Sequence, residues 1–179
     1  MKKATQIILA SAALFFIFHS CEAQKKIVLN REVDTTNDGK MLLGHQAKSQ
    51  FLKEPYSQWY VQEHDDYAVD QKAIDELKKE KLNSYGLTVV LGTWCEDSHR
   101  ELPRLFKILE TVGYPDSKLT LIAVNRKKEA PGGEESIYNI QMVPTIIVQK
   151  YGKEIGRIVE STQSGYIERD LLEILRRDN

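Results

Sequence analysis

The sequence LGTWCEDSHRELPRL, residues 91–105, decides the fold class. It follows a continuous apolar run, Leu87 to Leu91, which is typical of a buried central strand. A tight turn with one cysteine, Cys95, comes next, and apolar residues at helical spacing then begin. Cys95 is therefore predicted to lie at a strand-to-helix junction. A redox pair at such a turn has a second cysteine three positions later, and that position here is Ser98.

The segments around this turn have the patterns of an α/β domain. Asp70 can cap a helix that runs to Leu82, and residues 119–124 read as a second buried strand. Further segments predict a short helix, a β-hairpin and a C-terminal amphipathic helix: 134–140, 145–149 with 154–159, and 167–175. We expect a mixed central β-sheet flanked by helices.

Length and composition indicate one globular domain. The chain has 179 residues, of which 41% are hydrophobic and 28% charged, and the formal net charge is −1. This is enough apolar material for a core. A nearly neutral chain with scattered basic residues gives no reason to expect a nucleic-acid partner.

The first residues are predicted to be a secretory signal, residues 1–23. Lys2 and Lys3 precede an almost wholly apolar run, Ile7 to Phe18, which is short for a transmembrane helix. We favour cleavage before Cys21, which would then be acylated as in a lipoprotein. Cleavage after Ala23 is the alternative. We expect an exported protein that faces the periplasm or cell envelope and meets the membrane only through its lipid anchor.

Both cleavage sites leave Cys95 as the single thiol of the mature chain. Cys21 is either acylated or removed, and a Cys21–Cys95 bridge remains an option only if the signal is not processed. Residues 24–69 are weakly patterned and are expected to form an N-terminal extension. Its aromatic residues are predicted to pack on the domain that spans residues 70–179.

Residues 70–179 resemble a thioredoxin-like domain, and they are most similar to thioredoxin-family lipoproteins of Bacteroidetes-type bacteria. The chain has Trp94-Cys95-x-x-Ser98 at the strand–helix junction and Pro103 eight residues after the cysteine. It also has Val143-Pro144-Thr145 where the family has a cis-proline, and YGKEIGRIVE, residues 151–160, where the family has its closing hairpin. The motifs occur in order and at family spacing.

The resemblance implies roles for six residues. Cys95 would be the nucleophile, because a helix N-terminus stabilises thiolate, and Ser98 would donate a hydrogen bond to it. Trp94 would offer an apolar docking surface. Val143, Pro144 and Thr145 would present a backbone edge to an extended substrate.

The neighbouring charges act in opposite directions. Glu96 and Asp97 would disfavour the thiolate, although acidic residues also stabilise a first helical turn. His99 and Arg100 would favour the thiolate if they point toward the sulfur. Cys95 and His99 are four residues apart, but two ligands are too few, so we expect no metal. No cofactor motif is present.

Two departures from the family pattern shape the functional prediction. Ser98 cannot resolve a mixed disulfide, and Val89 stands where redox-active relatives often have a buried acid. The leading hypothesis is an envelope protein that forms mixed disulfides between Cys95 and client proteins or peptides, by thiol–disulfide exchange or isomerisation. An external thiol reductant would then release it. The alternatives are a redox-inactive peptide-binding module and a peroxide-sensing thiol.

Overall fold

The computed structural model describes residues 27–37 and 39–178. The predicted signal, its two cleavage sites and Cys21 lie outside the described residues. A six-stranded mixed sheet forms the centre of the molecule, in the order β1-β2-β4-β3-β5-β6. Its strands are β1 Arg31–Thr35, β2 Gly39–Gln46, β3 Gly86–Leu91, β4 Leu119–Ala123, β5 Thr145–Lys150 and β6 Lys153–Val159. Strands β3 and β4 are parallel, and the other neighbours are antiparallel.

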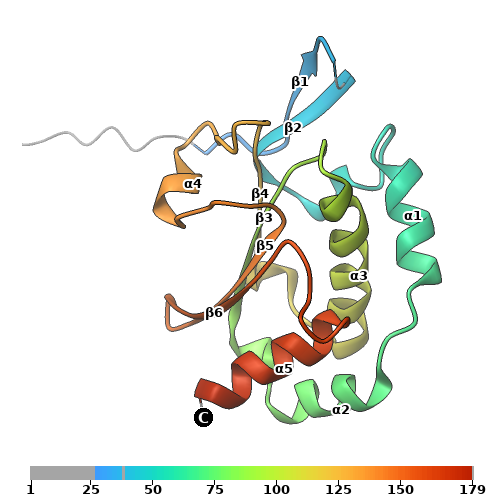
Figure 1. The fold of residues 1–179 in the computed structure, drawn as a ribbon, viewed down its shortest axis with the longest axis vertical. Helices are drawn as coiled ribbons and strands as arrows, with labels where there is room; N and C mark the ends of the chain where they lie inside the picture. Colours follow the sequence, from blue (N-terminus) through green and yellow to red (C-terminus); the bar gives the residue numbers. More distant parts are fainter. Residues whose placement is uncertain (1–26, 38, 179) are drawn as a thin grey trace, which may run out of the picture.

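The helices surround this sheet unequally (Figure 1). They are α1 Ser57–Asp66, α2 Gln71–Lys79, α3 Glu96–Val112, α4 Glu134–Ile137 and α5 Ile167–Asp178. Short 3-10 turns occupy Lys48–Gln50, Leu82–Ser84 and Asp116–Lys118. Helix α3 lies against one face of the sheet with α1 outside it, and α4 lies on the opposite side. The predicted α/β class, with a mixed sheet flanked by helices, is confirmed.

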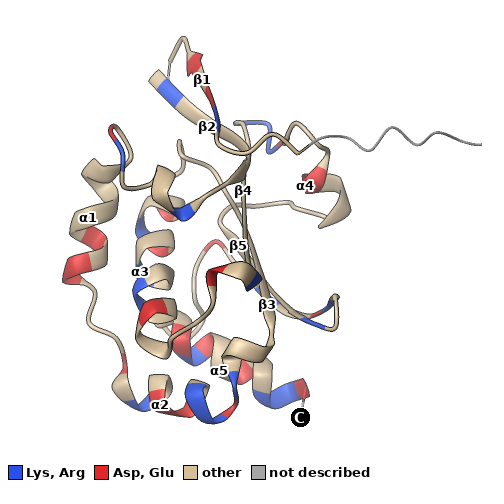
Figure 2. Ribbon diagram, turned by 180° about the vertical axis from the view of Figure 1, so that it is seen from behind, with Lys and Arg blue, Asp and Glu red and all other residues tan. Residues whose placement is uncertain are grey.

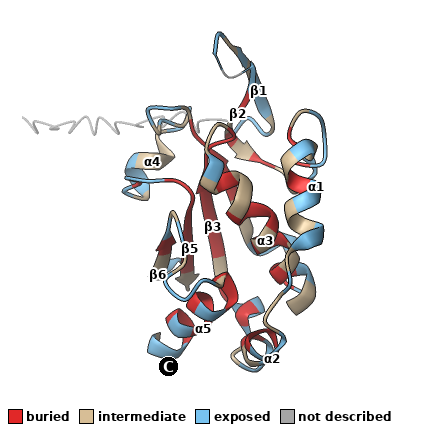
Figure 3. Ribbon diagram, turned by 45° about the vertical axis from the view of Figure 1, so that its right-hand side comes forward, coloured by how far each residue is buried: buried red, intermediate tan, exposed pale blue. Residues whose placement is uncertain are grey.

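Strand β3 divides the core between the two faces of the sheet. Leu87, Val89 and Leu91 belong to the larger apolar cluster, which includes residues of α1, α2, α3 and α5. Val90 belongs to a smaller cluster on the other face, together with Val143. Alternate side chains of a strand point to opposite faces, so both faces of β3 are covered, and Figure 3 shows it as buried. The continuous apolar run predicted this position correctly.

Residues before position 70 contribute two strands and a helix. Strand β2 pairs with β4, where His45 lies opposite Ile122. The predicted packing of the aromatic residues on the domain is confirmed, because Phe51, Tyr56 and Tyr60 are buried in the main core. The sequence did not predict a strand of this segment in the central sheet.

A buried carboxylate joins α5 to the start of α2. Asp70 caps α2 through the amides of Lys72 and Ala73, as predicted, although the helix ends at Lys79. Glu168 of α5 accepts a hydrogen bond from the Tyr67 hydroxyl at 2.7 Å and from the Asp70 amide at 2.6 Å. Because Glu168 is 0% exposed, these donors satisfy a charge that burial would otherwise destabilise.

Charged residues of both signs alternate along the outer helices, as Figure 2 shows for α2 and α5. Such a mixed surface is typical of a solvated face. Within the described residues, no helix is long and apolar enough to cross a membrane.

Candidate functional site

Cys95 lies at the start of α3 and faces a backbone carbonyl. It occupies the N-cap position with extended backbone angles, φ −106° and ψ 120°. Its Sγ donates a hydrogen bond to the Val143 carbonyl oxygen at 3.3 Å. The Val143–Pro144 peptide bond is cis. Residues 48 positions apart are thus brought together at one end of the sheet, and the thiol is partly exposed.

Trp94 covers the strand that leads into the turn. Its Nε1 donates a hydrogen bond to the Val124 carbonyl at 2.8 Å, and the Arg126 guanidinium lies 5.3 Å from the centre of its ring. A Cβ atom on Gly92 would come within 2.6 Å of the indole. The ring therefore occupies the space that a side chain at position 92 would need, and it borders the smaller apolar cluster beside Cys95.

The Ser98 hydroxyl serves the turn rather than the thiol. Ser98 is 0% exposed, and its Oγ accepts a hydrogen bond from the Gly92 amide at 3.2 Å. In the described part of the chain, this is the one hydrogen bond recorded for that hydroxyl. The expected hydrogen bond from Ser98 to Cys95 is therefore absent there. What the hydroxyl oxygen does supply is an acceptor for the Gly92 amide at the end of β3, which is buried.

The side chains of His99 and Arg100 contact groups other than the Cys95 sulfur, so the condition under which they would favour the thiolate is not met. The His99 ring lies 2.8 Å from the Thr93 carbonyl through Nε2. Arg100 forms ion pairs with Asp97 and Glu101, at 2.7 and 2.8 Å. These contacts raise the pKa of Arg100, chiefly through the hydrogen bond to Glu101. The Arg100 charge is thus directed to Asp97 and Glu101.

Val143, Pro144 and Thr145 reach the site mainly through their backbone. All three residues are buried. The Thr145 hydroxyl donates to the Met142 carbonyl at 2.7 Å, within the same loop. The Glu160 amide donates to the Pro144 carbonyl at 2.7 Å. Among residues 27–37 and 39–178, no acceptor is recorded for the Val143 amide.

Residues that the sequence did not single out support the Cys95 turn. The Leu42 amide donates to the Thr93 hydroxyl at 3.2 Å, and the ring of Trp59 stacks on that of His99. Leu42 and Trp59 belong to the segment before residue 70. Trp59 is one of the aromatic residues predicted to pack on the domain, but no sequence signal linked it or Leu42 to this turn, because both act through contacts with residues far along the chain.

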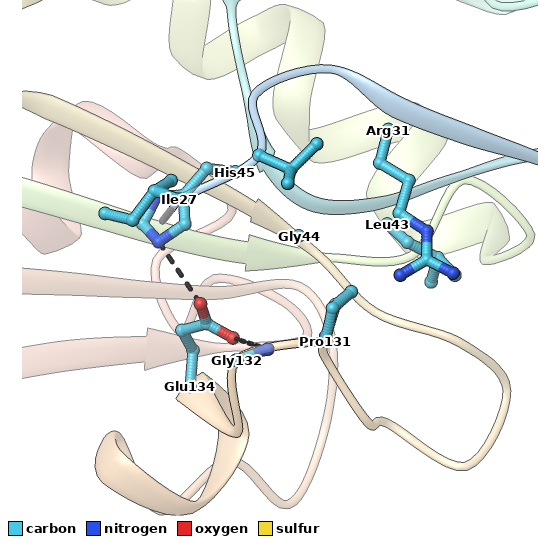
Figure 4. Close-up of a pocket in the computed structure, with 9 residues that line it drawn as sticks. Ile27, Arg31, Leu43, Gly44, His45, Pro131, Gly132 and Glu134 are labelled. Carbon is cyan, nitrogen blue, oxygen red and sulfur yellow. Dashed lines mark hydrogen bonds and ion pairs between the residues drawn. The ribbon is translucent and has the colours of Figure 1, made fainter. Parts of the chain in front are cut away.

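A separate cavity of about 260 Å³ lies beside the loop that follows β4 (Figure 4). The His45 imidazole and the Glu134 carboxylate face each other across it at 3.3 Å, and Glu134 also accepts from the Gly132 amide at 2.9 Å. Cys95 does not line this cavity. The described residues contain no group of three or more His, Cys, Asp or Glu side chains that could hold a metal ion.

Comparison with known proteins yields similarity of fold. No family model and no curated protein matches the chain. A crystal structure of a protein of unknown function from Pseudomonas aeruginosa matches with TM-score 0.58 and 14% identity, over 75% of this chain and 94% of that one. An HIV epitope-scaffold matches with TM-score 0.54 and 14% identity, over 74% and 91% of the chains.

Thioredoxin O2 from Arabidopsis thaliana, in its oxidized state, is also matched. Its TM-score is 0.37 and its identity 19%, over 62% of this chain and 90% of that one. The order of elements from residue 70 is helix, strand, helix, strand, short helix, hairpin and helix around a mixed sheet. This order of elements around a mixed sheet is the one predicted for a thioredoxin-like fold.

Proposed function

We propose that this protein performs thiol–disulfide exchange through Cys95 alone, as a monothiol member of the thioredoxin-like proteins. The observation that carries the proposal is the position of the thiol. Cys95 caps a 17-residue helix, stays partly exposed, and faces the carbonyl of Val143. Unpaired amides at a helix N-terminus stabilise the thiolate, which is the attacking species.

The proposed reaction conserves disulfide bonds. The Cys95 thiolate attacks one sulfur of a client disulfide, a new S–S bond forms, and the other client sulfur leaves as a thiolate. A second client thiolate can then attack the client sulfur of the mixed disulfide. This step re-forms a client disulfide with new pairing and returns Cys95 as a thiolate. Alternatively, an external thiolate attacks the Cys95 sulfur, and the client leaves as a thiolate. A second external thiolate then attacks the external sulfur of the new mixed disulfide, which gives the external disulfide and returns Cys95 as a thiolate.

An extended client segment would pair with the backbone beside Cys95. The Val143 amide donates to no acceptor among the described residues, and in this proposal it would donate to a client carbonyl. Met142, the preceding residue, is 39% exposed and adds an apolar contact. Strand addition of this kind derives affinity from the main chain and tolerates varied side chains, which suits a protein that acts on several clients.

Export and lipid anchoring at Cys21 are part of the same proposal. They are supported by the basic start, the apolar run and the cysteine that follows it. The intact mass of the mature protein isolated from membranes tests them. An acylated Cys21 supports the anchor, cleavage after Ala23 leaves only export, and a retained signal contradicts both.

The experiment for the exchange activity compares wild type with Cys95→Ser. Incubation with glutathione disulfide, followed by acid quenching and peptide mass analysis, should show one glutathione on Cys95 of the wild type. Insulin reduction should be weak, because Ser98 cannot release the mixed disulfide. Robust insulin turnover that survives Cys95→Ser would contradict the proposal, and so would a wild type that forms no adduct.

A redox-inactive peptide-binding module is the second candidate. It is favoured by the lack, among the described residues, of a hydrogen bond from the Ser98 hydroxyl to the sulfur; that hydroxyl accepts from the Gly92 amide. It is also favoured by Val89, an apolar residue of the main core at the position where redox-active relatives often have a buried acid. The pH dependence of Cys95 alkylation separates the two candidates. Slow alkylation, with the profile of an ordinary free thiol, supports the binding module.

A further inference from the structure

We propose that the segment before residue 70 positions the Cys95 turn, and that His99 is the positioning residue through which α1 acts on it. The inference rests on the proposed function only in so far as Cys95 is the working residue. It concerns the geometry of residues 92–95 and can be tested without any client.

His99 forms hydrogen bonds to two residues of the turn, Thr93 and Cys95. Its backbone amide donates to the Cys95 carbonyl at 3.0 Å, as the first turn of α3 requires. Its ring reaches back to the Thr93 carbonyl, with 2.8 Å between Nε2 and the oxygen. Since a carbonyl can only accept, the ring carries a proton on Nε2. The turn itself closes through the Cys95 amide, which donates to the Gly92 carbonyl at 3.0 Å.

Trp59 of α1 fixes the His99 ring in this orientation. The two rings stack with centres 4.4 Å apart and an angle of 11° between their planes. Trp59 in turn meets the buried Phe51 edge to face, with centres 6.1 Å apart. A ring held between a rigid aromatic neighbour and a carbonyl has one favourable orientation, so the stack restricts where the Thr93 peptide can lie.

A second contact from the same segment restrains Thr93 from its other side. The Leu42 amide of β2 donates to the Thr93 hydroxyl at 3.2 Å in a buried position. Thr93 is thus held by β2 through its side chain and by α3 through its carbonyl. Because Thr93 lies two residues before Cys95, both contacts define where the thiol meets the unpaired amides of α3.

The experiment uses the full chain and follows iodoacetamide alkylation of Cys95 by peptide mass analysis, so that Cys21 does not interfere. Hydrogen exchange of the Cys95 amide is measured in parallel. His99→Phe keeps a ring to stack on Trp59 but removes the donor, His99→Gln keeps a side-chain donor without the stack, and Trp59→Leu removes the partner ring.

His64 of α1 provides a matched control for His99 of α3. His64 stacks on Tyr60 with centres 5.6 Å apart and planes at 17°, and its Nε2 lies 3.0 Å from a Glu110 oxygen. Like His99, His64 stacks on an aromatic ring and contacts an oxygen atom. Its partner Glu110 lies near the C-terminal end of α3, away from the Cys95 turn. His64→Phe therefore perturbs the same helix pair without touching the turn.

We expect His99→Phe and Trp59→Leu to slow alkylation about two- to fivefold at neutral pH, which corresponds to loss of a typical helix-terminus interaction. The rate profile should move to higher pH, and exchange of the Cys95 amide should become faster. His99→Gln should give a rate between those of wild type and His99→Phe, because it keeps a donor but loses the stack. His64→Phe should keep the wild-type rate.

Two results would overturn the inference: wild-type rates in His99→Phe, or an equal slowing in His64→Phe, which would indicate general loosening. Failure of the proposed function gives a different result. Wild type would then form no mixed disulfide with glutathione, while the variants would still differ from it in alkylation and amide exchange.

Discussion

Replacement of Gly92 by alanine should displace Trp94 and destabilise the protein. The new Cβ would lie 2.6 Å from Cε2, 2.8 Å from Nε1 and 2.9 Å from Cζ2 of the indole. Carbon atoms pack favourably at about 3.5–4.0 Å, so the ring has to move by about 1 Å. The backbone of Gly92 does not lie in the left-handed region, and the effect of alanine there is therefore one of space.

The displacement has two costs. The Trp94 Nε1 donates to the Val124 carbonyl at 2.8 Å, and a shift of about 1 Å takes this pair beyond hydrogen-bonding distance. Loss of the bond costs about 0.5–1.5 kcal/mol, and overpacking costs about 1–3 kcal/mol. A total of about 1.5–4.5 kcal/mol corresponds to a fall in Tm of about 3–18 °C for a domain of this size.

Gly86 provides the matched control at the other end of β3. A Cβ there would meet Gln149 at 3.8 Å, an ordinary contact, so Gly86→Ala should be neutral or stabilise by about 0.4–1 kcal/mol. Urea unfolding measures both variants, and the indole N–H resonances report the ring. The reasoning is refuted if Gly92→Ala is as stable as Gly86→Ala and its indole resonances are unchanged.

Three further changes test the hydrogen bonds and ion pairs of the fold. Ser98→Ala leaves the buried Gly92 amide without its acceptor and should lower the free energy of unfolding by about 1–3 kcal/mol; a change within error in urea unfolding would contradict this. Glu168→Ala leaves two donors unpaired and should cost about 2–4 kcal/mol, which calorimetry can measure. The hydrogen bond from Lys40 lowers the pKa of Glu32 below its ordinary value of 4.5. The contribution of Glu32 to stability is thus complete above that pH and is lost as pH falls through the lower folded pKa, so Glu32→Gln should flatten the acid limb of the stability profile.

The parts of the fold that the sequence predicted are those with local signals. A continuous apolar run identifies β3 because a central strand is buried on both faces. Asp70 identifies the start of α2 because a carboxylate caps the free amides of a helix. The turn at Tyr151 and Gly152 separates two strands that are close in sequence. Each of these features depends on residues within a few positions of one another.

Strand β2 and helix α1 lacked such signals. Strand β2 carries Gly44 in the left-handed region, with φ +73°, which interrupts the alternation expected of a strand. Its partner β4 begins at Leu119, far along the chain. In α1, Tyr60 is the one buried residue, so the helix has little apolar periodicity. Both elements are stabilised by packing on distant residues, which a pattern within the segment does not reveal.

The same distinction applies within the site. The spacing of Cys95, Ser98 and His99 predicts that they share the first turn of a helix, and they do. It does not predict which acceptor or donor each side chain selects. The His99 ring turns to the Thr93 carbonyl because Trp59 stacks on it, and Trp59 comes from the segment whose structure the sequence left unassigned.

Ser98 stands where a redox pair has its second cysteine, and it also has a structural role. Its hydroxyl oxygen accepts from the Gly92 amide in a position with no access to water, and a buried amide without a partner is costly. Sulfur is a weak acceptor, so a cysteine there would supply a resolving thiol and satisfy that amide less well. In the proposed mechanism, the residue that cannot release a mixed disulfide is therefore also the residue that supplies the acceptor for the buried Gly92 amide at the end of β3.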